Sequence, residues 1–216
     1  MNSNKLTELS FKELIKTTKL FNIHGLHPII IGGWAVYYYT KGAGSIDIDL
    51  VLPTKQVIQV FEKYSKQYGF KKDRKAKTRT LFRKETGEKE IELDIFTLSD
   101  KNTLASNKSI EIPWKLADKN SKEWKINKDV TARVPEKEVL LLYKTAALKD
   151  RQYKIKTWAN LSKFSRDRLK AKIEKDKRDI QGLLKLEINQ EKLNELLEKT
   201  KFKKYYDETL KEIERE

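Results

Sequence analysis

The sequence has no cysteine, and only two of its 216 residues are histidine. The absence of cysteine excludes a disulfide framework, a thiol nucleophile and a cysteine-ligated zinc site. His24 and His27 flank Gly25 in a turn-like segment, so we interpret both as loop residues rather than as metal ligands. A zinc centre of the common structural kinds is therefore not expected.

Long apolar runs are also missing. No stretch reaches the roughly 18 consecutive apolar residues of a membrane-spanning helix, and no signal peptide is recognised ahead of the first expected helix. We therefore expect a cytoplasmic protein without a membrane partner. The length allows one large domain or two small ones, and either arrangement can bury a substantial core.

Positive charge is in excess: the formal net charge is +15, and 37% of the residues are charged. A polyanionic partner would explain this excess, and so would a lysine-rich proteome or a thermophile's charged surface. The basic residues are clustered, with eight Lys or Arg and one acid in residues 71–84, and twelve and four in residues 149–178. This clustering favours nucleic acid as the partner.

One stretch near the N-terminus organises the chain. The β-branched run Ile29–Ile31 predicts a buried strand. Gly32 and Gly33 then allow a tight turn whose backbone N–H groups can approach a ligand closely. Trp34–Thr40 is long enough for a short helix, whose N-terminus favours phosphate. Ile46–Leu52 alternates in part between apolar and acidic residues and predicts a second strand.

Three aspartates form the candidate reactive cluster. Strand alternation would place Asp47 and Asp49 on one face, and Asp94 has a similar apolar setting within a third expected strand, Glu90–Phe96. Neighbouring carboxylates repel each other unless a cation lies between them, and a hard divalent metal such as Mg²⁺ suits them. An Asp-x-Asp pair or a Gly-Gly turn alone is common, but their joint order indicates a site.

Taken together, the strand, Gly-Gly, short helix, Asp-x-Asp and later lone Asp resemble the nucleotidyltransferase superfamily typified by DNA polymerase β, over residues ~28–97. The resemblance implies a nucleoside triphosphate such as ATP as donor and Mg²⁺ or Mn²⁺ as cofactor. It also implies metal ligands at Asp47, Asp49 and Asp94, with phosphate oxygens held by Gly32, Gly33 and Ser45. Where members often carry an arginine shortly before this serine, the present chain has Ala43-Gly44.

A hairpin should bring a cation to the acids. Thr78–Arg83 predicts a strand that turns at Glu85–Lys89 into the Asp94 strand. This pairing would hold Arg79 or Arg83 near the acidic cluster, either to grip a triphosphate or to neutralise the carboxylates. Further along, two tryptophans in a polar context, Trp114 and Trp124, could stack on a base, although anchoring a core is the commoner role.

After Pro135 the pattern becomes helical. Glu136–Arg151 is apolar over much of its circumference yet carries Lys144 on its apolar stripe, and Arg166–Leu186 carries Asp176 on its own stripe. An unpaired carboxylate there would cost several kcal/mol. Asp176 therefore needs a partner, and Lys144 or Arg151 is the natural candidate.

This helix pair resembles the AbiEii-like branch of the superfamily in its Lys…Ala-Leu…Arg helix followed by Lys-Asp-x-x-Asp-Ile. The branch includes toxins of toxin–antitoxin systems that modify tRNA. The resemblance implies active-site roles for Lys144 and Asp176, with Lys175, Asp179 and Arg151 as supporting residues. It also implies that Lys144, Arg151 and Asp179 bind the nucleotide. A buried ion pair that only joins two helices is the alternative, and both roles can coexist.

These features predict an α+β fold with a small mixed sheet flanked by helices, and an all-helical C-terminal domain. We expect a core domain over residues 1–134, and a domain over residues 135–216 that contributes to the active site. The expected activity is transfer of a nucleoside monophosphate to an acceptor hydroxyl with release of pyrophosphate. RNA, most simply the tRNA 3′ end, is the expected acceptor, with a possible antitoxin partner. The alternatives are an antibiotic or protein hydroxyl, or a non-catalytic RNA-binding module that kept the fold.

Overall fold

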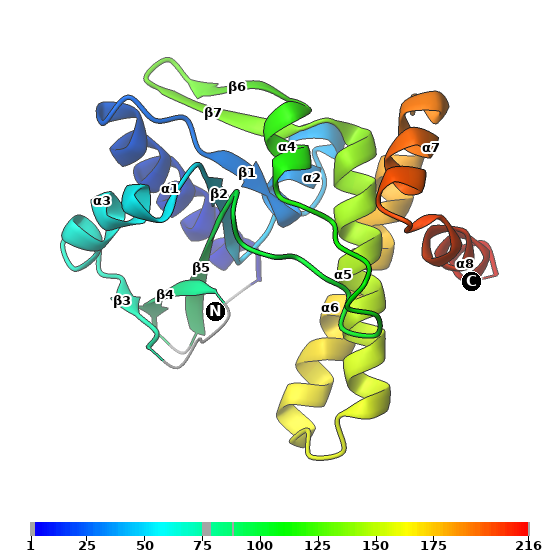
Figure 1. The fold of residues 1–216 in the computed structure, drawn as a ribbon. Helices are drawn as coiled ribbons and strands as arrows, with labels where there is room; N and C mark the ends of the chain where they lie inside the picture. Colours follow the sequence, from blue (N-terminus) through cyan, green and yellow to red (C-terminus); the bar gives the residue numbers. More distant parts are fainter. Residues whose placement is uncertain (1–2, 75–78, 88, 216) are drawn as a thin grey trace. The chain divides into compact units, whose positions relative to one another are not determined.

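The computed structural model describes residues 3–74, 79–87 and 89–215. Over these residues the chain has a seven-stranded sheet and eight helices, and it divides into two compact units (Figure 1). The sheet unit comprises Met1–Asp100 and Trp114–Glu136, and the helical unit comprises Lys101–Pro113 and Lys137–Glu216. The expected α+β class is confirmed, and the functional domains at 1–134 and 135–216 stay a prediction.

The elements follow the chain in a simple order. The strands are β1 (Ile29–Ile31), β2 (Ile48–Leu52), β3 (Lys71–Lys72), β4 (Thr80–Thr86), β5 (Lys89–Thr97), β6 (Ser121–Asn127) and β7 (Val130–Pro135). The helices are α1 (Ser3–Ile23), α2 (Gly32–Thr40), α3 (Lys55–Ser65), α4 (Lys115–Lys119), α5 (Lys137–Thr157), α6 (Lys163–Leu184), α7 (Gln190–Lys199) and α8 (Lys203–Ile213). None of the helices in the described ranges is long and apolar enough to cross a membrane.

The sheet is mixed, with strand order β3-β4-β5-β2-β1-β7-β6. Strand β1 runs antiparallel to β2 and parallel to β7, while β2 runs parallel to β5. All three residues of Ile29–Ile31 are buried, as the β-branched run predicts. The β2–β5 pairing matters most for function, because it brings together two strands that both carry aspartates.

Aromatic packing fixes one side of the sheet unit. Phe61 of α3 is fully buried, and its ring centroid lies 4.8 Å from that of Phe82 and 5.6 Å from that of Phe70. Phe21 of α1 stacks on the same ring at 6.3 Å. Such pairs add to the hydrophobic burial that holds α1 and α3 against the strands.

The helical unit is built on α5, which packs against α6, α7 and α8 (Figure 1). Residues from Glu138 to Ala146 are all buried, as the apolar circumference of this helix requires. The segment Lys101–Pro113 belongs to this unit because α5 holds it at two points. Tyr143 Oη donates to the Pro113 carbonyl at 2.9 Å, and the Ala105 amide donates to Asp150 Oδ1 at 2.7 Å.

Two expected element boundaries are corrected by the structure. Helix α2 begins at Gly32 and not at Trp34, and strand β2 begins at Ile48 and not at Ile46, so Asp47 precedes the strand. The β1–β2 ladder stops at the Ile31–Asp49 pair because β1 turns directly into α2 there. Two further positions of the expected β4–β5 hairpin, Thr78 and Glu88, lie outside the described residues.

Candidate active site

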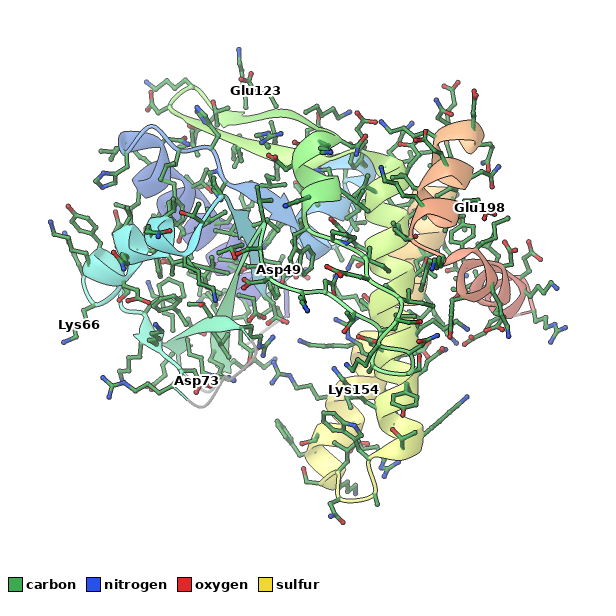
Figure 2. All side chains as sticks on the ribbon, viewed as in Figure 1. Asp49, Lys66, Asp73, Glu123, Lys154 and Glu198 are labelled. Carbon is green, nitrogen blue, oxygen red and sulfur yellow. The ribbon has the colours of Figure 1, made fainter. Side chains whose placement is uncertain are left out.

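The Gly-Gly turn and the Asp-x-Asp strand meet at Gly32 and Asp49. Ile31 pairs with Asp49 across the β1–β2 ladder, and the next residue, Gly32, adopts a φ of +66°. A Cβ at position 32 would lie 2.1 Å from Asp49 Oδ2. The Asp49 carboxylate therefore occupies the space that the side chain of any other residue at position 32 would fill. Asp49 is labelled in Figure 2.

Asp94 lies directly beside Asp49. The two residues are register partners on the parallel strands β2 and β5, so their side chains project from the same face of the sheet. Asp94 is buried, with 4% of its surface exposed. Its Oδ1 atom has no hydrogen-bond partner within the described parts of the chain. An orphaned buried carboxylate oxygen is costly unless a ligand or ion satisfies it.

Arg79 contacts the other oxygen of this carboxylate, with 2.6 Å between its Nη1 and Asp94 Oδ2. The expected cation beside the acids is therefore Arg79. Burial and the neighbouring charge of Asp49 raise the pKa of Asp94 to about 7, Arg79 opposes this rise, and Glu92 and Asp47 add to it. Asp47, although it precedes β2, thus acts electrostatically on Asp94.

Arg83, the other candidate cation, serves a separate acidic group. Its Nε donates to Asp73 Oδ2 at 3.0 Å, and its Nη1 lies 2.6 Å from Glu92 Oε1 and also contacts Glu90. Glu92 is 2% exposed, so this guanidinium compensates a deeply buried carboxylate. Arg83 therefore holds the β4–β5 hairpin together at the acidic residues that flank Asp94.

The remaining predicted phosphate-binding residues lie around the α2 end of β1. Gly33 is buried in the first turn of α2, and Ser45 is buried in the connection from α2 to β2. Gly44, just before this serine, has a φ of +70°, and a Cβ there would lie 2.9 Å from atoms of Thr7 and Trp34. The close packing explains a glycine at a position where an arginine would not fit without rearrangement.

The carboxylates of the site provide part of the ligand set of a hard divalent cation. Among the residues that the structure describes, no group of three His, Cys, Asp or Glu side chains is gathered closely enough to hold a metal ion. The pair Asp49 and Asp94 nevertheless provides two carboxylates in register, one with an unsatisfied oxygen. Mg²⁺ commonly takes one or two protein carboxylates and completes its shell with water and substrate phosphates. Two carboxylates are therefore a sufficient protein contribution.

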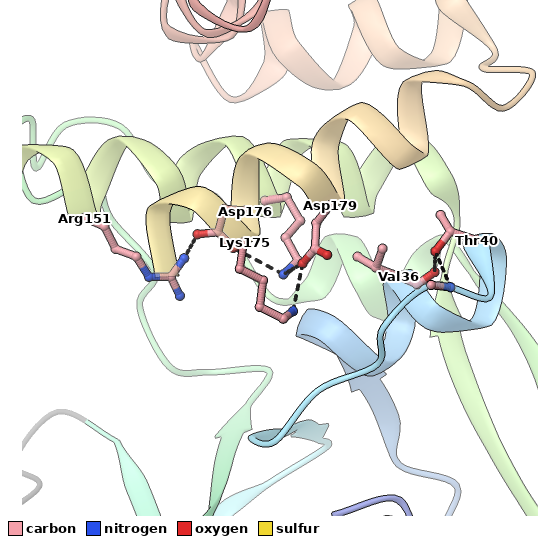
Figure 3. A network of polar contacts seen from close by, with 8 residues as sticks. Val36, Thr40, Arg151, Lys175, Asp176 and Asp179 are labelled. Atoms are coloured by element: carbon pink, nitrogen blue, oxygen red, sulfur yellow. Dashed lines mark hydrogen bonds and ion pairs between the residues drawn. The ribbon is translucent and has the colours of Figure 1, made fainter. Parts of the chain in front are cut away.

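The helical unit contains a second cluster of predicted site residues (Figure 3). Lys144 on α5 is buried, and its Nζ lies 2.7 Å from Asp179 Oδ2 and 3.3 Å from Asp176 Oδ1 on α6. Lys175 reaches Asp179 Oδ2 at 3.0 Å, and Arg151 Nη1 contacts Asp176 Oδ2. The structure thus pairs Asp176 with both partners that the sequence proposed, and it adds Asp179 as the closer contact of Lys144.

Neither tryptophan is open to a base. Trp114 and Trp124 are each 8% exposed. The first packs on Phe96 with ring centroids 4.7 Å apart, and the second packs on Tyr38 at 5.3 Å. Both therefore anchor the core of the sheet unit.

Sequence reasoning missed the ion pair between α1 and β4, in which Glu13 Oε2 lies 2.9 Å from Lys84 Nζ. The only sign of this pair in the sequence is a charged residue, Glu13, on the apolar face of the first helix.

No known protein family matches the chain, and no curated protein matches it in sequence. Among solved structures, it is similar to the lincosamide antibiotic adenylyltransferase LnuA in its lincomycin-bound form. The TM-score is 0.46 and the sequence identity 18%, over 80% of this chain and 94% of that chain.

Proposed function

We propose that the protein is a metal-dependent nucleotidyltransferase that transfers a nucleoside monophosphate from a nucleoside triphosphate to an acceptor hydroxyl. The observation that carries this proposal is the meeting of Gly32, Asp49 and Asp94, with one buried oxygen of Asp94 left unsatisfied. A protein that only binds polyanions gains nothing from adjacent carboxylates. A protein that binds Mg²⁺ with a triphosphate needs them.

Each residue of the sheet unit has a distinct proposed role. Asp49 and Asp94 would hold the divalent cation, with Asp47 as the proposed third carboxylate. When bound, the cation would compensate phosphate charge and lower the pKa of the attacking hydroxyl. The N-terminal amides of α2, at Gly32 and Gly33, donate to phosphate oxygens, and Ser45 adds a hydroxyl donor.

The chemistry is a substitution at the α-phosphorus. The acceptor oxygen forms a bond to the α-phosphorus, and the bond to the bridging oxygen breaks, so that pyrophosphate leaves with that oxygen. The proton of the hydroxyl passes to water. The chain's own contribution is to position the phosphates and to compensate their charge, because little covalent work is required of the protein.

Lys144 is the proposed cation of the helical unit. Its ammonium is held by Asp176 and Asp179, and Lys175 and Arg151 in turn hold those carboxylates. A lysine fixed in this way neutralises developing phosphate charge without losing side-chain entropy when the substrate binds. Its role in the reaction rests on this preorganisation and on the sequence resemblance.

RNA is the proposed acceptor, most simply the 3′ end of tRNA. The net charge of +15 and the twelve basic residues against four acids in residues 149–178 support a polyanionic substrate. On this proposal the protein acts as an RNA-modifying toxin, and a neutralising antitoxin is its expected partner. A small-molecule acceptor would need no such concentration of positive charge.

The test is incubation with total RNA, Mg²⁺ and each of the four α-labelled nucleoside triphosphates in turn. Label in a tRNA-sized band is the expected result, and Asp49→Asn should abolish it. Asp129→Asn is the matched control, because it makes the same chemical change at an exposed turn before β7. Label that persists in Asp49→Asn would refute the metal assignment. RNA binding without transfer by any triphosphate would favour the non-catalytic binding module.

A further inference from the structure

The turn between α5 and α6 carries an exposed basic surface, which we call the hairpin tip (Lys154–Lys172; Figure 1). It contains seven Lys or Arg residues and a single acid, Asp167. All of its residues are described, and none of them is buried. The hairpin tip therefore concentrates positive charge in a segment with no fully buried residue. The first buried residue of α6, Ile173, follows it.

Two exposed aromatic rings lie within this charge. Trp158 is 52% exposed and Phe164 is 77% exposed, and in the described chain the only other exposed large hydrophobic residue is Ile23. Lys154 Nζ, on the side chain labelled in Figure 2, lies 5.6 Å from the Trp158 ring centroid. Single exposed apolar residues are ordinary. Two aromatic rings six residues apart among seven cations indicate a binding surface.

The turn that presents these rings is ordered by its own hydrogen bonds. Ser162 caps α6, because its hydroxyl accepts from the Ser165 amide at 3.1 Å. Arg166 Nη1 donates to the Ile155 carbonyl at 3.4 Å and so ties the start of α6 to the end of α5. Because this turn is already ordered, binding here costs less conformational entropy than binding that must first order a loop.

We propose that the hairpin tip binds single-stranded RNA, with unpaired bases stacked on Trp158 and Phe164 and phosphates held by Lys156, Lys163 and Lys170. These three lysines are exposed and form no ion pair with another described residue. Basic grooves with aromatic platforms are how proteins hold single strands, because every base offers a face for stacking. The inference deepens the proposed function, on which the choice of RNA over DNA rests.

Two other anionic partners fit less well. A duplex keeps its bases stacked and presents only phosphates, which leaves the aromatic rings without a role. An anionic membrane surface binds in proportion to the apolar area buried, and two rings among seven cations offer little such area. Both partners serve as arms of the test.

The test measures fluorescence anisotropy of a short unstructured RNA against salt concentration. The tip variant is Lys156→Gln with Lys163→Gln and Lys170→Gln. Its matched control is Lys185→Gln with Lys199→Gln and Lys204→Gln, three exposed lysines elsewhere in the helical unit. We expect the tip variant alone to lower the slope of log affinity against log salt by about 2, at roughly 0.7 per lost phosphate contact. Trp158→Ala and Phe164→Ala should each weaken binding about tenfold.

Several outcomes would overturn the proposal. Equal loss in the tip and control variants would show that only overall charge matters. A duplex that binds as tightly as a single strand, with no effect of the aromatic variants, would remove the stacking role. Tip-dependent binding to vesicles of anionic phospholipid without RNA binding would assign the surface to membranes. Asp49→Asn separates the two proposals, because it should keep RNA binding while it loses nucleotide transfer.

Discussion

Asp49 occupies the space where a side chain on Gly32 would begin, since a Cβ built on Gly32 lies 2.1 Å from Asp49 Oδ2. The carboxylate and the glycine therefore depend on each other, and a larger residue at position 32 must displace the proposed metal ligand. Because Asp94 is the register partner of Asp49, the displacement would also disturb the carboxylate pair.

Gly32→Ala should abolish nucleotide transfer and destabilise the fold. The expected loss exceeds the roughly 1–2 kcal/mol that a left-handed backbone costs a residue with a Cβ. The matched control is Gly25→Ala, because Gly25 has a φ of +71° but nothing within 4 Å of its Cβ position. Urea denaturation and transfer assays of both variants separate backbone strain from the clash. Equal loss in the two variants would contradict the close approach.

The raised pKa of Asp94 predicts a pH dependence of stability in the metal-free protein. The folded-state pKa of about 7 lies above the ordinary value of 3.8, so the folded state binds the proton more tightly. The resulting stabilisation is complete below pH 3.8 and is lost as the pH rises through about 7. Its size is on the order of a few kcal/mol.

The measurement is the free energy of unfolding against pH for the wild type and for Asp94→Asn, without divalent metal. Their difference isolates the Asp94 contribution from the titration of other carboxylates. Wild-type stability should fall relative to the variant between pH 4 and 7. Added Mg²⁺ should restore wild-type stability at the upper end of this range, because it compensates the ionised carboxylates. A pH-independent difference would show that Asp94 titrates normally.

The two lysines that contact Asp179 should differ in their effect on stability. Lys144 Nζ lies 2.7 Å from Asp179 Oδ2 with 8% of its side chain exposed, whereas Lys175 Nζ lies 3.0 Å away with 33% exposed. Removing one partner of a buried pair costs about 3–5 kcal/mol, while exposed pairs contribute about 0–1 kcal/mol. Lys144→Met should therefore cost several-fold more than Lys175→Met.

Urea denaturation at pH 7 measures both lysine variants, and the transfer assay separates structure from function. If Lys144 acts on phosphate, Lys144→Met should lose activity under conditions where it remains folded. Activity close to that of the wild type in the folded variant would reduce the cluster to a structural tie between α5 and α6. Lys175→Met is the control: it removes one contact to Asp179 but keeps the buried ammonium of Lys144.

Local patterns predicted much of the fold, and they named the residues of the candidate site. The β-branched run of β1, the Gly-Gly turn and the alternation of β5 were readable because each depends on neighbouring residues. The start of β2 at Ile48 was not readable, since this residue pairs with Leu93 of β5, which is distant in the sequence. The stripe around Asp176 predicted Lys144 or Arg151 as its partner, and the structure contains both contacts.

What the sequence could not predict are the tertiary contacts that select among equivalent residues. Arg79 and Arg83 were equal candidates for the cation beside the acids. The β4–β5 register pairs Arg83 with Glu92, whereas Arg79, just before β4, contacts Asp94 through its side chain. Segment 101–113 has no periodic pattern, and its place beside α5 depends on hydrogen bonds to Tyr143 and Asp150.

The contact of Arg79 with Asp94 predicts competition between this guanidinium and a metal ion. Arg79 Nη1 lies 2.6 Å from Asp94 Oδ2, on one of the two carboxylates that would hold the proposed metal. Arg79→Gln removes the competing cation, so Mn²⁺ should bind the nucleotide-free protein more tightly, by about tenfold for a contact that contributes ~1.4 kcal/mol. The apparent affinity for the triphosphate should fall in the same variant if Arg79 swings onto phosphate once the metal displaces it.

Arg83→Gln is the matched control for this prediction. It removes a guanidinium from β4, the strand that begins directly after Arg79, but one that contacts Asp73, Glu90 and Glu92 rather than the metal-binding pair. It should destabilise the protein, because Glu92 is left buried without its cation, and should leave Mn²⁺ affinity nearly unchanged. Titration calorimetry with Mn²⁺ measures both variants. If Arg79→Gln binds Mn²⁺ more weakly than the wild type, then Arg79 supports the metal site instead of competing for it, and Asp94 does not exchange one cation for the other.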